Sequence, residues 1–580
     1  MDYLSNFKFW MQNEYFDKET REELDKIKDR EKEIEERFYK DLEFGTGGLR
    51  GIIGAGTNRM NRYTVRRASQ GVANYIGKQG EEAKSKGIVI AYDSRNKSAE
   101  FALEAARVFA GNGIKAYLFD ELRPTPELSF AVRHLGAKAG IVITASHNPK
   151  EYNGYKVYGE DGAQLSLEGS NAVLEEMNRL TDITRVKLMD KNEAVKKGML
   201  KVIGKEIDDE YISRLKTLSI NPDFAGAVGD SFKLVFTPLH GTGNKPVRRI
   251  LDEIGFKNVL VVREQELPDP EFSTVKSPNP EEKSAFSLAM DLAEKENVDL
   301  IIATDPDCDR VGVAVRNSAG DYIILSGNQI GCLLLEYILS QKKSKMQLPQ
   351  NGFVVKTIVT TELARKIAES YAVELVEVLT GFKFIGEQIK LLDEYGDKKF
   401  LFGFEESLGY LAGTFARDKD GVVACMLIAE MAAYYKTRGM SLYDGLQEIY
   451  KKYGYFVESV SSFGLDGIEG LAKIKKTMDR LREKKPERFN TSEVAAIRDY
   501  ERSQRWDLRT KKTEVLTLPK SDVLYYEMQD GSWFCIRPSG TEPKIKIYFG
   551  TSAVDMERAE LKMAALRDDV LGVVKGLLNH

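Results

Sequence analysis

The chain has 580 residues, of which 42% are hydrophobic and 30% charged, and its 85 basic and 89 acidic residues leave a formal net charge of −4. This length predicts about three to five domains, because a single core stops growing near roughly 250–300 residues. The near balance of charge excludes a bulk positive field that would attract nucleic acid, although local clusters can still bind anions.

The N-terminal segment and the cysteines indicate a cytoplasmic protein. Residues 1–44 are charged and helical in pattern, without the uninterrupted apolar core of a signal peptide. The apolar stretch from Gly421 is too short to span a bilayer and carries Glu430, which favours a buried helix. The absence of a Cys-x-x-Cys pair argues against a disulfide framework or a structural zinc site. The four widely spaced cysteines are Cys308, Cys332, Cys425 and Cys535.

After this segment, short β-branched runs alternate with amphipathic stretches. Residues 87–95 predict a strand, 98–113 a helix closed by glycine, 114–120 a second strand, and 139–149 a strand that runs into "TASHNP". Such a β-α-β rhythm predicts a mostly parallel sheet covered by helices.

The same rhythm returns over residues 232–310 and 351–410, and each round ends a strand in a polar loop that contains or adjoins glycine. Ligands collect at the carboxyl ends of strands in open α/β sheets. A charged helix over 465–490, alternating strands and a last helix over 553–578 predict a smaller α+β domain. The predicted domains are 1–205, 206–322, 323–455 and 456–580.

The segment "DPDCDR" places Asp305, Asp307 and Asp309 at alternate positions after an apolar strand. Three carboxylates on a short loop create a negative potential that a divalent cation would relieve. The loop is not an EF-hand, because arginine stands at its sixth and twelfth positions in place of glycine and glutamate. A magnesium site and a solvated acidic turn both remain open.

"TASHNP" places Ser146 directly before His147. No G-x-S-x-G elbow is present, and adjacency is expected to point the two side chains in different directions, so a hydrolase nucleophile is not supported. Ser146 also fits a helix N-cap at a strand-to-helix turn. The same position suits a phosphoserine, because a helix N-terminus stabilises an anion.

Four further loops carry candidate ligand-binding groups. "IRPSGTEP" has the composition of a phosphate site or of an ordinary hairpin. "FGFEESLGY" could chelate vicinal sugar hydroxyls or form a surface turn, and "LTGFKFIGE" could contact phosphate or carry a snorkelling lysine. "FGTGGLRG" lacks the ending of a P-loop. The residues concerned are Arg537, Ser539, Gly540, Thr541, Glu405, Ser407, Lys383 and Arg50.

Taken together, the motifs resemble those of the α-D-phosphohexomutase superfamily. "TASHNP" is similar to its phosphoserine loop, "DPDCDR" to its magnesium loop, "GFEES" to its sugar-binding loop and "RPSGTEP" to its phosphate-binding loop, in the family's order. "FGTGGLRG", "TPLHGTG", "LTGFKFIG" and "RDKDG" resemble the branch of phosphoglucomutases and phosphopentomutases. The resemblance implies a four-domain architecture, with three similar mixed α/β domains and a smaller C-terminal α+β domain around a central cleft.

The resemblance also implies roles for residues. Ser146 would carry a phosphoryl group and complete the coordination of Mg²⁺ held by Asp305, Asp307 and Asp309. Lys156 would act as general acid or base. Arg50, His147, Lys156 and Arg310 would surround the transferring group, and the substrate would contact Glu405, Ser407, Lys383, Arg417, Arg537, Ser539, Gly540 and Thr541.

The activity that this resemblance implies is conversion of glucose 1-phosphate to glucose 6-phosphate, with glucose 1,6-bisphosphate as intermediate and activator. A phosphopentomutase, a glucose 1,6-bisphosphate synthase and a non-catalytic sugar-phosphate-binding protein are the alternatives. The expected partner is a small phosphosugar and not a nucleic acid or a membrane. The chain is expected to be a monomer or a homodimer.

Overall fold

The computed structural model describes residues 2–45, 47–465, 467–539 and 544–578. These residues form two compact units. One comprises Met1–Gly327 with Ile385–Tyr443, and the other comprises Asn328–Phe384 with Asp444–His580.

The first unit begins with three short helices that build a small core of their own. They are α1 (Tyr3–Gln12), α2 (Lys18–Asp25) and α3 (Glu31–Phe38). Asp2 and Asp17 cap α1 and α2 by accepting backbone N–H groups of the first turn. The rings of Trp10 and Phe16 stack 4.3 Å apart, and Tyr63 packs edge-on against them. This aromatic cluster anchors the N-terminal segment to α4 (Arg62–Gly77).

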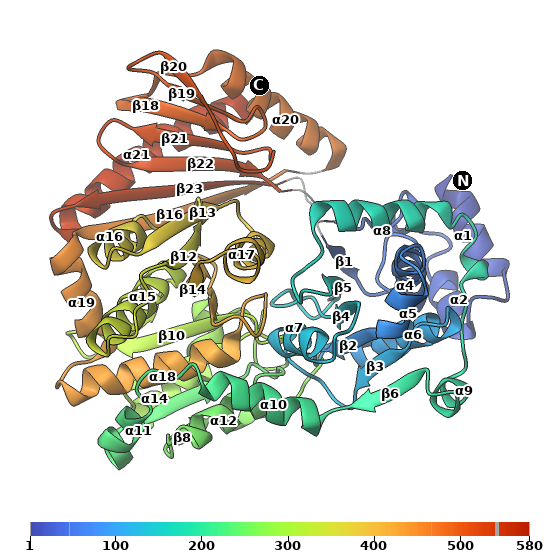
Figure 1. Ribbon diagram of the computed structural model, residues 1–580. Helices are drawn as coiled ribbons and strands as arrows, with labels where there is room; N and C mark the ends of the chain where they lie inside the picture. The colour runs from blue at the N-terminus through green and yellow to red at the C-terminus, as the bar shows by residue number, and fades with distance from the viewer. Residues whose placement is uncertain (1, 46, 466, 540–543, 579–580) are drawn as a thin grey trace. The chain divides into compact units, whose positions relative to one another are not determined.

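A six-stranded sheet follows, in the order β1-β5-β4-β2-β3-β6 (Figure 1). Neighbouring strands are parallel from β4 to β6, whereas β5 runs antiparallel to both β4 and β1. Helices cover both faces, since β2 and β4 are buried along almost their whole length. The strands are β1 (Gly48–Ile52), β2 (Ile88–Tyr92), β3 (Ala116–Phe119), β4 (Ala139–Ile143), β5 (Tyr152–Gly159) and β6 (Leu200–Ile203). The helices are α5 (Glu81–Lys86), α6 (Ser98–Gly111), α7 (Thr125–His134), α8 (Leu167–Arg179) and α9 (Lys191–Lys196).

The second sheet repeats this plan in the order β11-β10-β9-β7-β8. Strands β8, β7 and β9 are parallel, and β10 turns back antiparallel to β9 and pairs with β11. The strands are β7 (Leu234–Thr237), β8 (Val259–Val261), β9 (Leu300–Thr304), β10 (Val311–Arg316) and β11 (Tyr322–Leu325). The helices are α10 (Lys205–Lys216), α11 (Asp223–Val228), α12 (Asn244–Glu253), α13 (Arg263–Glu266) and α14 (Ser287–Glu296).

The first unit is completed by a hairpin and a long apolar helix. Strands β14 (Lys399–Glu405) and β15 (Gly409–Ala412) pair antiparallel. Helix α18 (Gly421–Thr437) is buried on nearly every residue and packs against α11 and α12. The buried helix expected from Gly421 is thus confirmed. In the described part of the chain, no helix is long and apolar enough to cross a membrane.

The second unit combines a parallel strand pair with an antiparallel sheet. Strands β12 (Gly352–Thr357) and β13 (Glu374–Val378) are parallel, and α16 (Leu363–Ser370) connects them. The C-terminal sheet has the order β16-β23-β22-β21-β18-β19-β20, and β17 pairs with β18. Every pairing in it is antiparallel. Its strands are β16 (Tyr455–Gly464), β17 (Arg488–Phe489), β18 (Ser492–Asp499), β19 (Gln504–Asp507), β20 (Lys512–Val515), β21 (Leu524–Met528), β22 (Trp533–Pro538) and β23 (Lys544–Ala553).

Helices of this unit are α15 (Gly327–Ser344), α19 (Leu442–Tyr453), α20 (Gly467–Lys484) and α21 (Met556–Leu578). Apolar residues of α20 and α21 share a core with β21, β22 and β23. The predicted fold class, three mixed α/β domains followed by an α+β domain, is confirmed. The boundaries 1–205, 206–322, 323–455 and 456–580 stay predictions.

Candidate functional site

Three functional loops of the first unit occupy the same place in the plan of the fold. Each joins two antiparallel strands: β4 to β5, β9 to β10, and β14 to β15. Each also holds one non-glycine residue in the left-handed region: Ser146 at φ 51°, Cys308 at 52° and Leu408 at 64°. Such a φ is uncommon outside glycine, so each loop is held in its conformation by its surroundings.

The left-handed conformation of Ser146 corrects two expectations. Its Oγ lies 3.2 Å from Nδ1 of His147, so the two side chains face each other. An extended backbone would have pointed them apart, but the positive φ reverses the chain at Ser146. Ser146 does not begin a helix in the described chain, because the residues after it form a turn that leads directly into β5. The predicted helix N-cap at Ser146 is therefore wrong, and an anion there gains nothing from a helix dipole.

The side chain of Arg95 holds this turn in place through hydrogen bonds to its backbone. Its guanidinium donates to the carbonyl oxygens of Pro149 at 2.9 Å and Tyr152 at 3.1 Å, and also to those of Ser146 and Asn148. The side chain of Arg95 is fully buried, and Asp93 lies 3.2 Å from its Nε. One planar cation thus binds four carbonyl groups of the serine loop, a geometry that only arginine offers.

The acidic loop has the donors of a divalent-cation site. Ligand oxygens of Asp305, Asp307 and Asp309 lie within 4.8 Å of one another, and all three residues are buried. Among the described residues, Oδ1 of Asp307 and Oδ1 of Asp309 have no hydrogen-bond partner. Burial, with the neighbouring Asp307 and Asp309, raises the pKa of Asp305 well above its usual range. Three crowded carboxylates with two such oxygens fit a hard cation such as Mg²⁺.

Ser146 faces this acidic loop. Its Oγ donates a hydrogen bond of 2.6 Å to Oδ2 of Asp305, across 159 positions of sequence. The serine is 4% exposed. A phosphoryl group on Ser146 Oγ would therefore place anionic oxygens beside the cation site.

Two lysines balance the acidic loop. Nζ of Lys156 lies 2.8 Å from Asp307 and 3.5 Å from Asp309. Burial opposes its charge, but these carboxylates raise the pKa of Lys156 above its ordinary value. Lys419 lies 3.1 Å from Asp309, and its pKa is likewise raised against burial. Sequence reasoning did not single out Lys419, although it lies inside the quoted "RDKDG" motif.

The surroundings of His147 lower its pKa, whereas those of the two lysines raise theirs. Burial, followed by the positive charges of Arg310 and Arg50, lowers the pKa of His147 well below its usual range. Its imidazole is therefore neutral at neutral pH and can accept a proton. Arg50, on β1, donates to the side chain of Asn148 at 3.2 Å, which places it at the serine loop.

Arg310 joins the acidic loop to the predicted sugar loop. It donates to the carbonyl oxygen of Ser407 at 3.0 Å and to Glu281 at 2.8 Å. The backbone N–H of Val311 donates to Leu408 O at 3.1 Å. Glu405 ends β14 and is 6% exposed. The structure thus brings Ser146, His147, Lys156, Arg50 and Arg310 together with the acidic loop and the loop of Glu405 and Ser407.

The other predicted substrate residues lie on other segments of the chain. Arg417 is 2% exposed, donates to the carbonyl oxygen of Thr414, and pairs with Glu394 at 3.1 Å. Lys383 lies on α17 (Phe382–Ile389) rather than in a strand-end loop. Arg537 is the penultimate residue of β22 and lies two positions before Ser539, and both belong to the second compact unit. Gly540 and Thr541 lie outside the described residues. The substrate-binding roles of all these residues stay predictions.

The fold and these loops define a multidomain α/β protein whose strand-end loops gather a buried serine, a carboxylate triad and basic groups. Four domain models of the phosphoglucomutase/phosphomannomutase family match the chain in order. They are alpha/beta/alpha domain I over residues 41–183, domain II over 209–320, domain III over 326–453 and the C-terminal domain over 480–566. The chain belongs to this family, in the α-D-phosphohexomutase superfamily.

Curated relatives extend the match over nearly the full chain. A phosphoglucomutase of Staphylococcus haemolyticus is 40% identical over 528 residues, which are 90% of this chain and 93% of that one. A phosphoglucomutase of Staphylococcus aureus strain MSSA476 is 39% identical over 541 residues, 93% of this chain and 95% of that one. Among solved structures, the open form of Paramecium pp63/parafusin has a TM-score of 0.67 at 17% identity, covering 93% of this chain and 96% of that one. This last likeness concerns the fold alone.

Proposed function

We propose that this protein is a phosphoglucomutase that interconverts glucose 1-phosphate and glucose 6-phosphate through a phosphorylated Ser146. One observation carries the proposal: the buried Ser146 hydroxyl lies 2.6 Å from a carboxylate of the triad. Full-length relatives at 39–40% identity bear the name phosphoglucomutase.

The reaction proceeds in two transfers. In the first, a hydroxyl oxygen of glucose 1-phosphate bonds to the phosphorus of phosphoserine 146 while the bond from phosphorus to Ser146 Oγ breaks. Glucose 1,6-bisphosphate forms, the sugar hydroxyl loses its proton, and Ser146 Oγ gains one. After the bisphosphate reorients, its other phosphoryl group moves to Ser146 Oγ, and glucose 6-phosphate leaves. Because such transition states are loose, positioning and charge neutralisation supply most of the acceleration.

Residues of this chain take roles that their electrostatics support. Neutral His147, 3.2 Å from Ser146 Oγ, exchanges the serine proton in each transfer. Lys156, protonated beside Asp307, acts as a cation and proton donor toward the moving group. Asp305, Asp307 and Asp309 would hold Mg²⁺, which supplies charge neutralisation when bound. Arg50 and Arg310 contribute positive charge at the same place.

The remaining predictions complete the proposal. Glu405 and Ser407 read the sugar hydroxyls, and Arg537 grips the phosphate that does not react, together with Ser539, Gly540 and Thr541. Lys383 and Arg417 contact the substrate. Glucose 1,6-bisphosphate primes the enzyme by phosphorylating Ser146. We also propose a cytoplasmic location, which the four free, buried cysteines support.

The test is a turnover assay of the purified protein on glucose 1-phosphate with Mg²⁺ and trace glucose 1,6-bisphosphate. Glucose 6-phosphate should form, and Ser146→Ala should abolish it while substrate still binds. Ribose 1-phosphate and 1,3-bisphosphoglycerate, offered in parallel, identify a phosphopentomutase or a bisphosphate synthase. Faster turnover on either, or retained turnover in Ser146→Ala, would overturn the proposal.

A further inference from the structure

Each carboxylate of the acidic loop has one oxygen that is held by nitrogen donors of the protein. Oδ1 of Asp305 accepts the backbone N–H groups of Asp309 at 3.1 Å and Arg310 at 3.0 Å. Oδ2 of Asp309 lies 3.1 Å from Nζ of Lys419. Donors that hold one oxygen of a carboxylate also orient the other, so these contacts decide which oxygen each side chain offers to a cation.

The donors to Asp307 come from the first sheet and its helices. Oγ1 of Thr125, the first residue of α7, donates to Oδ2 of Asp307 at 3.0 Å, across 182 positions of sequence. Nζ of Lys156 donates to the same oxygen at 2.8 Å. The backbone N–H of Thr125 also donates to the carbonyl oxygen of Asp307, at 2.9 Å. Oδ2 therefore has two donors, whereas Oδ1 of Asp307 has no hydrogen-bond partner among the described residues.

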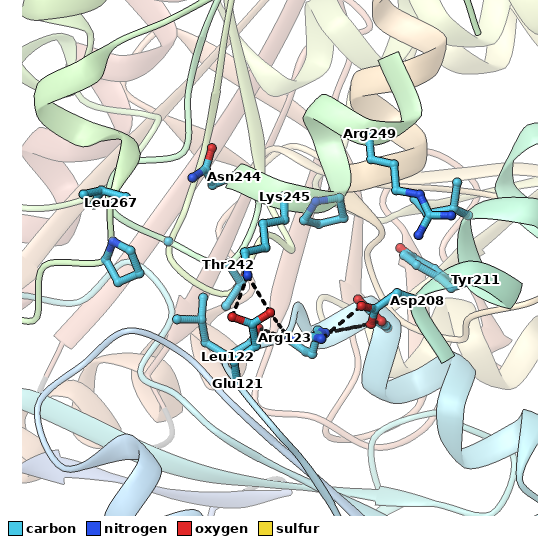
Figure 2. Close-up of a pocket in the computed structure, with 15 residues that line it drawn as sticks. Glu121, Leu122, Arg123, Asp208, Tyr211, Thr242, Asn244, Lys245, Arg249 and Leu267 are labelled. Carbon is cyan, nitrogen blue, oxygen red and sulfur yellow. Dashed lines mark hydrogen bonds and ion pairs between the residues drawn. The ribbon is translucent and has the colours of Figure 1, made fainter. Parts of the chain in front are cut away.

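The segment that carries Thr125 is itself held in place. Both neighbours of Thr125 are prolines, whose rings fix the backbone φ near about −65°. The side chain of Arg123 donates to both carboxylate oxygens of Asp208, at 2.7 and 3.0 Å (Figure 2). The backbone N–H of Arg123 donates to the carbonyl oxygen of Tyr92, at the end of β2, at 3.1 Å. The fully buried Thr125 is therefore held at Asp307 by a segment with little conformational freedom.

A carboxylate held in this way offers a single oxygen to a cation. Mg²⁺ takes about six ligands at about 2.0–2.1 Å in a nearly ideal octahedron. Ca²⁺ takes about six to eight ligands at about 2.3–2.6 Å, and it also binds carboxylates through both oxygens. If both oxygens of Asp307 turned toward an ion, the bond from Thr125 would be lost. A site of single-oxygen carboxylates therefore suits the smaller ion.

We propose that Thr125 is a positioning residue of the cation site, whose hydroxyl holds Asp307 as a single-oxygen ligand and thereby strengthens the binding of Mg²⁺ and favours it over Ca²⁺. The inference rests on the metal site proposed above. It adds to that site a residue which has no part in phosphoryl transfer itself and acts only through Asp307.

The test is calorimetric titration of the full chain with Mg²⁺ and, separately, with Ca²⁺. Thr125→Val keeps the size of the side chain but removes the hydroxyl, and it should weaken Mg²⁺ binding roughly ten-fold, as loss of a group that orients a metal ligand does. Ca²⁺ binding should weaken by a smaller factor, so the preference for Mg²⁺ should fall. Thr125→Ser keeps the hydroxyl and should bind both ions as the wild type does. Thr125→Ala should repeat the valine result, and it replaces that variant if the valine chain does not fold.

Thr551→Val is the matched control. Thr551 is 3% exposed in the second compact unit, and its hydroxyl donates to the carbonyl oxygen of Ala559 at 3.0 Å. This variant should also lose stability, but it should keep the wild-type affinity for both ions.

Unchanged Mg²⁺ binding in Thr125→Val, an equal loss of affinity for both ions, or a serine variant that behaves like the valine variant would overturn the proposal. A wild type that binds no Mg²⁺ would refute the metal site and this inference with it. Wild-type Mg²⁺ binding that Thr125→Val leaves intact would refute the inference alone.

Discussion

Replacing Arg95 with lysine should lower turnover without removing any group that touches the substrate. The guanidinium of Arg95 donates to four carbonyl oxygens of the serine loop and pairs with buried Asp93. Lysine keeps the positive charge, but its single nitrogen can reach about two of the four oxygens. At about 1.5 kcal/mol for each bond to a charged group, losing two costs about 3 kcal/mol.

The loss of these bonds should displace Ser146, because its carbonyl oxygen is one of the four acceptors. A displacement near 1 Å can lower a rate roughly 100-fold. We therefore expect kcat of Arg95→Lys to fall about that much, with KM almost unchanged and the melting temperature lowered. Arg179→Lys is the matched control, since that side chain is 60% exposed and pairs only with Glu176 among the contacts described. A wild-type kcat in Arg95→Lys would refute the positioning role.

Three other changes test the site and its surroundings. Asp309→Asn should weaken Mg²⁺ binding, measured by calorimetry, at least about 100-fold, because it removes a ligand and its charge; an unchanged affinity would contradict the metal site. His147→Gln should lower kcat at least about 100-fold, and the wild type should keep its activity below pH 6.5 because the pKa of His147 lies well under that value; wild-type turnover in the variant would remove His147 from proton transfer. Asp420→Asn should remove one contribution to the pH dependence of the melting temperature, since burial raises the pKa of Asp420 to about 6.

The direction of this last effect follows from proton binding. Between the ordinary Asp pKa of 3.8 and about 6, the folded state holds a proton on Asp420 that the unfolded chain has lost. The contribution of Asp420 to the stability of the wild type therefore falls as pH rises through that window, by about 3 kcal/mol, and changes no further above it. Asparagine can keep the bonds to Val423 N and Tyr211 without titrating. A difference in stability between the wild type and Asp420→Asn that stays constant across this window would contradict the assignment.

The strands and helices were largely predictable, because their apolar periodicity is local. The run at 87–95 became β2, and 98–113 became α6. The carboxylates at 305, 307 and 309 could be named for the same reason, since their spacing is read directly from the chain. Lys419 could have been found as well, because it lies in a motif already noted.

What could not be predicted depends on backbone conformation and on distant contacts. Nothing in "TASHNP" shows that Ser146 takes a φ of 51°, so both its turn and its approach to His147 were missed. Arg95 lies 51 positions before the carbonyl of Ser146 that it binds. The bond from Ser146 to Asp305 spans 159 positions and exists only after two sheets have formed. Such pairs have no local sequence signal.

The measurement closest to the central claim is the site of phosphorylation during turnover. The protein is mixed with glucose 1,6-bisphosphate and Mg²⁺, quenched, digested and mapped by mass spectrometry. We predict one phosphate on Ser146, and when this phosphate carries a label and excess unlabelled glucose 1-phosphate is added, the label should leave Ser146 for the sugar at a rate at least equal to kcat. Phosphate on another residue, or turnover with Ser146 unmodified throughout, would contradict the account.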